Sequence, residues 1–223
     1  MGVGQHYQGT AGQRYFEWQR RNGASKGAIN ARKFAEDIPP DSVLVDFGCG
    51  GGFLLEQLRA REKKGIEPNQ AARESALARG LNVVASASEL EAESVDVVIS
   101  NHALEHALSP FDELRDLARI LKPGGKLVVW LPLDDWRAQR KLNPEDVNHH
   151  LYAWTPLLLG NLLTEAGFEV QGVWPVTRAW PRGIHRLKRL PASVLEPLSW
   201  AWSVAARRRQ LRAIALKPAA PSG

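Results

Sequence analysis

Short apolar runs alternate with amphipathic stretches along most of the chain. The runs are bounded by turn residues, as in strands buried in a parallel sheet, and occupy residues 42–47, 63–68, 82–87, 95–100, 126–133 and 168–176. Between them, apolar residues recur at helical spacing in residues 53–63, 69–80, 110–121 and 157–167. Strands that alternate with helices at this rhythm predict an α/β protein with a doubly wound parallel sheet.

Capping residues support three of these helices. Ser109 and Thr155 each stand directly before a proline, which is the usual order at a helix N-terminus. Gly80 follows the second helical stretch and is typical of a C-terminal cap. These three signals fix where the helices begin or end.

The two ends of the chain depart from the alternating pattern. Residues 13–37 are expected to form helical turns, with a break at Gly23 and Gly27. After residue 177 the pattern gives way to tryptophan-bearing segments, and a final strand is predicted over 211–218. We therefore expect a helical cap over 1–40, a core over 41–177, a basic tryptophan-rich helical insertion over 178–209, and a last strand with a tail over 210–223.

Composition is that of an ordinary globular protein with one large domain. The 223 residues are 44% hydrophobic and 24% charged. No run approaches the ~20 apolar residues that cross a bilayer, and the N-terminus lacks the apolar core of a signal peptide. The single cysteine, Cys49, excludes an internal disulfide framework and fits a reducing compartment. We therefore expect a cytoplasmic protein.

Candidate binding residues follow the first predicted strand. Asp46 is followed by a loop in which Gly48, Gly50 and Gly52 allow a sharp turn and a close approach of a ligand to bare backbone. In an open α/β sheet, ligands bind at the carboxyl ends of the strands. The dinucleotide fingerprint GxGxxG requires a small residue where Phe53 stands, so the loop does not match that fingerprint.

The second predicted strand ends at Glu67. A carboxylate at this position can accept hydrogen bonds from both hydroxyl groups of a ribose. On its own, Glu67 is equally compatible with a solvent-facing residue before a turn. Combined with the glycine loop, it predicts a nucleoside ligand.

Four segments together have a recognisable pattern. They read VLVDFGCGGG, GIEP, VDVVISNHALEH and ARILKPGGKLVVWLP. Over residues 43–173 they resemble the class I S-adenosylmethionine-dependent methyltransferases. The resemblance implies a seven-stranded sheet whose last strand is antiparallel, and S-adenosyl-L-methionine as the cofactor.

The resemblance also implies roles for individual residues. Asp46 and the glycine loop correspond to the residues that hold the methionine part of the cofactor, and Glu67 to the one that holds its ribose. Ser86 stands where many relatives carry an aspartate that meets the adenine amino group, so its hydroxyl or the backbone of Ala87 is expected to replace that contact. Asn101 is expected to contact the methionine chain.

Histidines supply the candidate catalytic groups. His149 and His150 follow the fifth predicted strand, and an imidazole there is a natural general base for a hydroxyl acceptor. His102 and His106 fit the HxxEH pattern of inverted zinc peptidases. That short motif follows a buried strand, so we expect no metal and assign His106 to helix packing or to the substrate side.

A basic segment near the C-terminus indicates the charge of the acceptor. Residues 178–217 carry ten Lys/Arg and one acidic residue, a net charge of +9, whereas the whole chain carries +5. We favour a helical insertion that covers the active site over attachment to anionic lipid. Nucleic-acid binding ranks last, because base-amino methyltransferases usually have an NPPY-like motif where this chain reads SNHA. The acceptor is expected to be anionic.

The sequence thus predicts a methyltransferase that acts on a small or lipid-linked acceptor, with an oxygen as the methylated atom. Two alternatives stay open. One is a zinc-dependent hydrolase that uses His102 and His106, and the other is a noncatalytic nucleoside-binding module.

Overall fold

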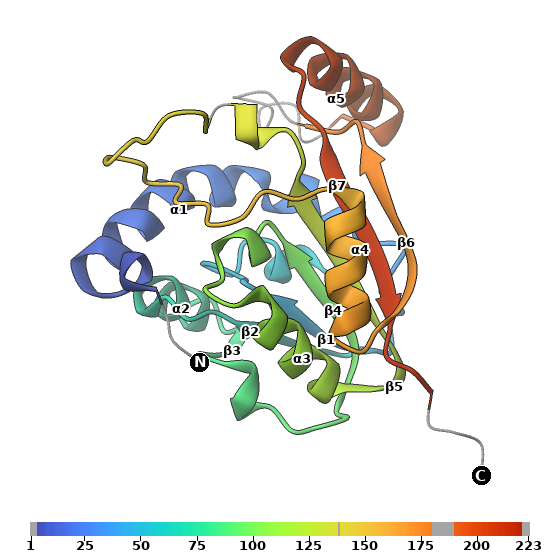
Figure 1. Ribbon diagram of the computed structural model, residues 1–223. Coiled ribbons are helices and arrows are strands. Elements are labelled where there is room, and N and C mark those ends of the chain that lie inside the picture. The colour runs from blue at the N-terminus through green and yellow to red at the C-terminus, as the bar shows by residue number, and fades with distance from the viewer. Residues whose placement is uncertain (1–3, 138, 180–189, 220–223) are drawn as a thin grey trace.

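One seven-stranded sheet organises the molecule (Figure 1). The computed structural model describes residues 4–137, 139–179 and 190–219. The strands lie in the order β3-β2-β1-β4-β5-β7-β6, and β7 is antiparallel to both neighbours while the other pairs are parallel. Their bounds are β1 Val43–Phe47, β2 Glu62–Ile66, β3 Asn82–Val84, β4 Val95–Asn101, β5 Leu121–Pro132, β6 Glu169–Val176 and β7 Gln210–Leu216. The predicted doubly wound sheet and its antiparallel last strand are confirmed.

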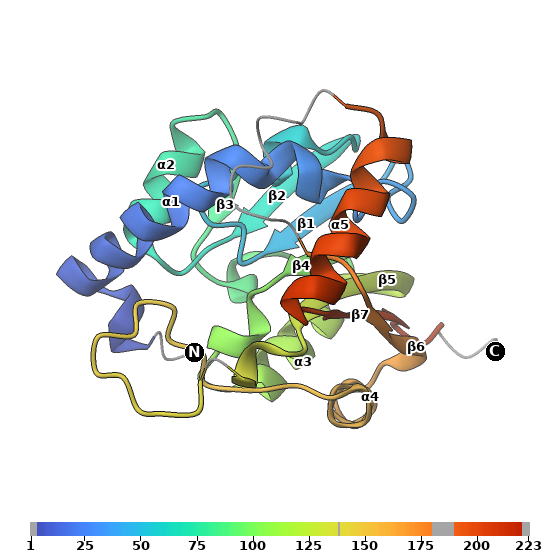
Figure 2. The same cartoon turned by 90° about the horizontal axis from the view of Figure 1, so that it is seen from above.

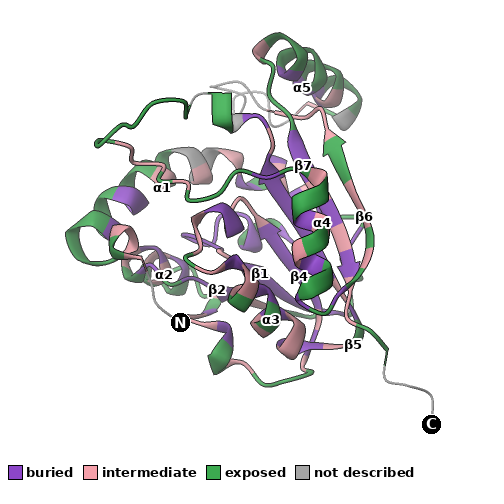
Figure 3. Ribbon diagram, in the orientation of Figure 1, coloured by how far each residue is buried: buried purple, intermediate pink, exposed green. Residues whose placement is uncertain are grey.

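Helices cover both faces of the sheet (Figure 2). They are α1 Gly9–Ala31, α2 Gln70–Leu77, α3 Pro110–Ile120, α4 Pro156–Glu165 and α5 Ala192–Ala206. On one face, buried leucines of α3 and α4 pack against the strands, among them Leu114, Leu117, Leu159 and Leu163. On the other face, Phe34 and Leu55 lie in a second apolar cluster with β1, β4 and β5. The central strands β1 and β4 are almost wholly buried, whereas edge strand β6 is half-buried or exposed along its length (Figure 3).

The predicted caps are present. The Ser109 hydroxyl accepts a hydrogen bond from the Asp112 backbone N–H, and the Thr155 hydroxyl accepts one from the Leu158 N–H. These bonds satisfy amide groups that the first turn of a helix leaves without partners. Gly80 follows α2 with a φ of +76°, the left-handed conformation expected of a glycine after a helix.

The helix predicted over residues 53–63 is wrong. Only a single 3₁₀ turn, Leu55–Gln57, forms between β1 and β2. The glycine loop takes up the first residues of this short crossover, so too few remain for an α-helix before β2 begins at Glu62. The leucines that suggested a helix still enter the core, because Leu55 and Leu58 are buried against the sheet.

The break predicted at Gly23 and Gly27 is also wrong, because α1 is continuous from Gly9 to Ala31. The glycines serve close packing instead. A Cβ atom at Gly27 would lie 2.2 Å from the carbonyl oxygen of Phe53, and one at Gly23 would lie 2.8 Å from the Phe53 ring. The helix therefore rests directly on the segment that follows the glycine loop.

The insertion predicted over residues 178–209 contains α5, and residues 180–189, with Trp180, lie outside the described residues. Helix α5 lies near the carboxyl ends of the parallel strands (Figure 1). Trp200 and Trp202 are exposed on it. No helix in the described parts of the chain is long and apolar enough to cross a membrane.

Several arginines of the basic segment have acidic partners. The guanidinium of Arg209 donates two hydrogen bonds to the carboxylate of Asp134, and that of Arg212 bonds Asp37. Arg178 pairs with Glu196. Part of the positive charge therefore attaches the insertion and β7 to the core.

Packing against Phe53 sets the first prediction. Gly27→Ala should lower the free energy of unfolding by more than about 1 kcal/mol, because the new methyl group meets backbone that cannot move aside. Gly160→Ala in α4 is the matched control, since a Cβ there meets only Val173 at 3.8 Å. Helix propensity alone should make that control more stable by up to about 1 kcal/mol. Denaturant unfolding measures both, and stabilisation by Gly27→Ala would contradict the close approach.

Candidate cofactor site and catalytic cavity

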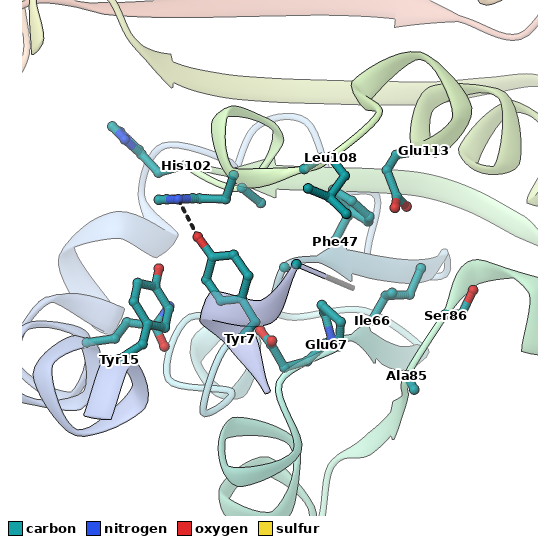
Figure 4. Close-up of a pocket in the computed structure, with 17 residues that line it drawn as sticks. Tyr7, Tyr15, Phe47, Ile66, Glu67, Ala85, Ser86, His102, Leu108 and Glu113 are labelled. Atoms are coloured by element: carbon teal, nitrogen blue, oxygen red, sulfur yellow. Dashed lines mark hydrogen bonds between the residues drawn. The ribbon is translucent and has the colours of Figure 1, made fainter. Parts of the chain in front are cut away.

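Four strands place polar residues at one edge of the sheet. Asp46 belongs to β1, Glu67 follows β2, Ser86 follows β3, and Asn101 ends β4. Two cavities border this edge. The first is lined by Glu67, Ser86 and residues of the N-terminal segment (Figure 4), and the second by Asp46, Asn101 and the glycine loop. The site residues predicted at the strand ends therefore lie together.

The glycine loop makes the sharp turn that the sequence predicts. Gly48, Gly50 and Gly52 have φ values of +73°, +55° and +77°, a region that other residues rarely adopt. A Cβ atom at Gly48 would lie 2.3 Å from that of Ala103, so the loop passes close to the segment after β4. Cys49 is buried in an apolar cluster, which agrees with a packing role.

Glu67 connects this loop to the end of β2. One carboxylate oxygen accepts a hydrogen bond from the Gly50 N–H at 2.7 Å, and the other accepts one from the Asn69 N–H at 2.8 Å. Burial raises the pKa of Glu67 to about 7, and these two N–H groups oppose that rise. Each carboxylate oxygen has a further lone pair for a ligand on the cavity side. A ribose with two adjacent hydroxyl groups fits this acceptor.

Asp46 is almost completely buried, and its Oδ2 atom has no hydrogen-bond partner in the described part of the chain. Burial, and then the nearby Glu67, raise the pKa of this carboxyl group well above its usual range. A positively charged ligand group next to Asp46 would favour its ionised form. S-adenosylmethionine carries such groups, an ammonium and a sulfonium, so the residues present fit it.

Ser86 lines the first cavity, whereas Ala87 is fully buried and lies outside both lining sets. The Ser86 hydroxyl accepts a hydrogen bond from the Ser88 N–H and so caps a 3₁₀ turn. Sequence reasoning missed Glu113 of α3, which lines the same cavity. Glu113 stands in the first turn of α3, where the helix dipole favours an acidic residue whether or not a cavity is near. Burial raises the pKa of Glu113 to about 7.

Asn101 is held by a residue that the sequence did not reveal. The Lys33 ammonium donates hydrogen bonds to the Asn101 side-chain oxygen at 2.9 Å and to the Gln210 side-chain oxygen at 2.8 Å. Burial lowers the pKa of Lys33 to about 7. Both Lys33 and Asn101 line the second cavity. The sequence offered one signal for a buried Lys33, which is that it directly precedes the apolar residue Phe34.

The structure separates the three candidate catalytic histidines. His106 and His150 line the second cavity, but His149 lines neither one. The His149 ring stacks on that of His6, with centroids 4.3 Å apart. Nδ1 of His106 lies 2.8 Å from the Tyr7 hydroxyl, the bond drawn as a dashed line in Figure 4. Burial lowers the pKa of His106 to about 4.

The HxxEH segment does not form the helix that a zinc peptidase needs. His102 has a φ of +58°, and only the 3₁₀ turn Leu104–His106 follows it. Nε2 of His102 lies 3.0 Å from the Gln210 side-chain oxygen. His102 and His106 therefore do not present two ligands from one α-helical face.

Glu105, between these histidines, is fully buried. Burial opposes its ionisation, but His102, His106 and His150 around it keep the pKa of this carboxyl group below its usual range. Sequence reasoning considered Glu105 only within the zinc motif. Its proximity to His150 depends on a contact between distant segments, which no local pattern encodes.

A seven-stranded sheet with an antiparallel β7, and acidic residues at the ends of β1 and β2, is the arrangement of class I S-adenosylmethionine-dependent methyltransferases. A family model described as a methyltransferase domain matches residues 18–173, and the chain belongs to this family. The predicted enzyme class and cofactor are therefore confirmed. The alternative of a zinc-dependent hydrolase is therefore wrong. The family assignment also favours an enzyme over the second alternative, a noncatalytic nucleoside-binding module.

Individual relatives are similar at modest identity. A ubiquinone biosynthesis O-methyltransferase of Serratia proteamaculans is 39% identical over 98 residues, which are 38% of this chain and 40% of that protein. The enzyme of the same name from Pectobacterium carotovorum is 29% identical over 214 residues, 89% of this chain and 75% of that protein. A solved S-adenosylmethionine-dependent methyltransferase from Archaeoglobus fulgidus has a TM-score of 0.64 at 19% identity, covering 91% of this chain and 99% of that chain.

Glu67 provides the second prediction. Glu67→Ala should weaken S-adenosylhomocysteine binding by about 1 to 3 kcal/mol, the scale of hydrogen bonds to a charged group. Glu74→Ala is the control, because Glu74 pairs only with exposed Gln70 on α2 among the hydrogen bonds that the described chain shows. Titration calorimetry of both variants tests the ribose assignment. Equal affinity of Glu67→Ala and the unaltered protein would contradict it.

Proposed function

We propose that the enzyme transfers the methyl group to a hydroxyl oxygen of a small or lipid-linked acceptor that carries an anionic group. The observation that carries the proposal is the second cavity. It extends from the glycine loop to a wall formed by His102, Glu105, His106 and His150. A hydroxyl acceptor must lose its proton during methylation, and imidazole is the side chain best suited to accept a proton near neutral pH. The relatives named O-methyltransferase support this choice of atom.

The cofactor supplies an electrophilic methyl group on a sulfonium. The chain contributes positioning. Asp46 and the glycine loop bind the methionine part, Glu67 orients the ribose, and Lys33 fixes the side chain of Asn101 beside the cavity. Correct alignment of two reactants removes a large part of the entropic barrier to a transfer reaction.

The N-terminal segment places aromatic rings at the site. Tyr7 and Tyr15 line the first cavity, and their rings meet edge to face with centroids 4.9 Å apart (Figure 4). Both rings lie beside His106. Aromatic walls around a transfer site strengthen the electrostatic interactions inside it.

His150 is the group that we assign to the acceptor hydroxyl, because burial lowers the pKa of His106 to about 4 and leaves it a weak base near neutral pH. His149 lines neither cavity. His150→Asn should lower turnover about a hundredfold or more and leave S-adenosylhomocysteine affinity unchanged. His149→Asn, which keeps a residue tolerant of its φ of +50°, should retain turnover.

The experiment uses labelled cofactor and a panel of hydroxyl-bearing and amine-bearing acceptors, with products identified by mass spectrometry. Methyl ethers as products would support the proposal. Methylation of amines alone would contradict the assignment to oxygen, and full turnover by His150→Asn would contradict the assignment of that residue.

The anionic group of the acceptor is assigned to Arg208. This residue is exposed and lines the second cavity, whereas the neighbouring Arg209 is engaged by Asp134. Positive charge at a cavity mouth attracts an anionic ligand, and salt weakens that attraction.

Arg208→Gln should therefore raise the acceptor KM several-fold and flatten its dependence on salt, with cofactor binding intact. Arg115→Gln removes the same charge from exposed α3 and serves as the control. Steady-state kinetics at two ionic strengths tests this. An unchanged KM and salt profile in Arg208→Gln would mean that the acceptor does not use this charge.

A further inference from the structure

Three potential metal ligands converge beside the second cavity. Glu105, His106 and His150 each offer one ligand atom, and these atoms all lie within 4.8 Å of one another. Two residues come from the turn after β4, and the third comes from the loop after β5. The carbonyl oxygen of Glu105 accepts hydrogen bonds from the backbone N–H groups of Leu151 and Tyr152, at 2.8 and 3.3 Å. The backbone therefore fixes the two segments against each other.

The carboxylate of Glu105 has histidines near it but no hydrogen bond within the described part of the chain. The residue is fully buried, and neither carboxylate oxygen makes a hydrogen bond to any residue that the structure describes. The closest basic atoms are Nδ1 of His102 at 3.4 Å and Nε2 of His150 at 3.9 Å. A buried carboxylate is costly unless it is paired or coordinates a metal. The chemistry of this buried carboxylate suits a cation as its partner.

His106 is oriented by its other contacts. Its Nδ1 atom lies 2.8 Å from the Tyr7 hydroxyl and 3.4 Å from the carbonyl oxygen of His149. A carbonyl can only accept, so this contact favours a proton on Nδ1. Nε2 then has the free lone pair that a metal requires. Histidine ligands usually have such a partner on the nitrogen that does not bind the metal.

We propose that Glu105, His106 and His150 bind one divalent transition-metal ion. Two imidazoles and one carboxylate suit Zn²⁺, Fe²⁺ or Mn²⁺ better than Ca²⁺ or Mg²⁺, which prefer oxygen ligands. This set differs from the zinc motif considered from the sequence, because His150 takes the place of His102.

The role of the ion rests on the proposed function. Three protein ligands leave coordination positions open toward the second cavity, where an acceptor hydroxyl can bind. A hydroxyl on a divalent cation loses its proton more readily than a free one. His106 and His150 then act as ligands of the ion, and the proton of the hydroxyl passes to water at the cavity mouth. The methyl group moves from the sulfonium to the oxygen, and S-adenosylhomocysteine leaves.

The test measures binding of Zn²⁺ and Co²⁺ to the untagged, chelator-treated full chain. Calorimetry gives the stoichiometry with Zn²⁺, and the visible spectrum of Co²⁺ reports its coordination. We expect one ion per chain, with at least a tenfold loss of affinity in Glu105→Gln and in His150→Asn. His149→Asn removes an adjacent imidazole outside the cluster and should bind the ion like the unaltered protein.

The same samples are assayed for S-adenosylhomocysteine binding and for methyl transfer before and after chelation. Absence of stoichiometric metal binding, or undiminished binding by a folded His150→Asn, would overturn the metal site even if Glu105→Gln fails to fold. Cofactor binding and hydroxyl methylation without any metal would leave the proposed function intact. Metal binding without methylation of any hydroxyl acceptor would instead remove the proposed function and leave the metal site.

Discussion

The hydrogen bond from the Gly50 N–H to Glu67 joins the two strand ends on which the site is built. It holds the glycine loop against the end of β2, and the positive φ angles at Gly48, Gly50 and Gly52 are the condition for reaching that position. The loop takes up part of the short crossover, so the segment after it packs as turns and not as a helix. Helix α1 in turn lies on Phe53 in that segment. A single contact thus determines the geometry from the sheet edge to the N-terminal cap.

Three buried carboxylates give this edge its chemical character. Asp46, Glu67 and Glu105 are each at most 7% exposed, and in the described chain none of them forms an ion pair with lysine or arginine. Arginines pair with acidic residues elsewhere, at Asp37, Asp134 and Glu196. The cost of burying Asp46 and Glu105 is one that positively charged ligand groups can relieve, whereas Glu67 is stabilised by the N–H groups of Gly50 and Asn69. Burial of these carboxylates lowers the folding stability of the protein at the edge where ligands are expected to bind.

Local sequence signals predicted the strands, the caps and the glycine loop, because each depends on residues close together in the chain. Ser109 and Gly80 are examples, since a cap requires only its own helix. The errors have a different origin. Gly23 and Gly27 were interpreted as helix breakers, but their small size serves a contact with Phe53 that periodicity cannot show. Lys33, Glu113 and the pairing of Glu105 with His150 were missed for the same reason, because tertiary packing brings them to the cavities. The glycine loop could be predicted because the residues that define it are adjacent in the sequence.

Helix α1 has few apolar residues on a defined face, and helices in proteins owe most of their stability to tertiary packing. Its order therefore depends on the surface beneath it, while Tyr15 of α1 and Tyr7 of the preceding 3₁₀ turn line the first cavity. The first cavity is lined by both the strand ends and this N-terminal segment, so it exists only in the closed form, with the segment packed on the sheet. A ligand that touches both the strand ends and α1 binds only the closed form, so its binding free energy adds to the stability of the cap. Folding of the N-terminal cap and occupancy of the site are in this way two linked equilibria.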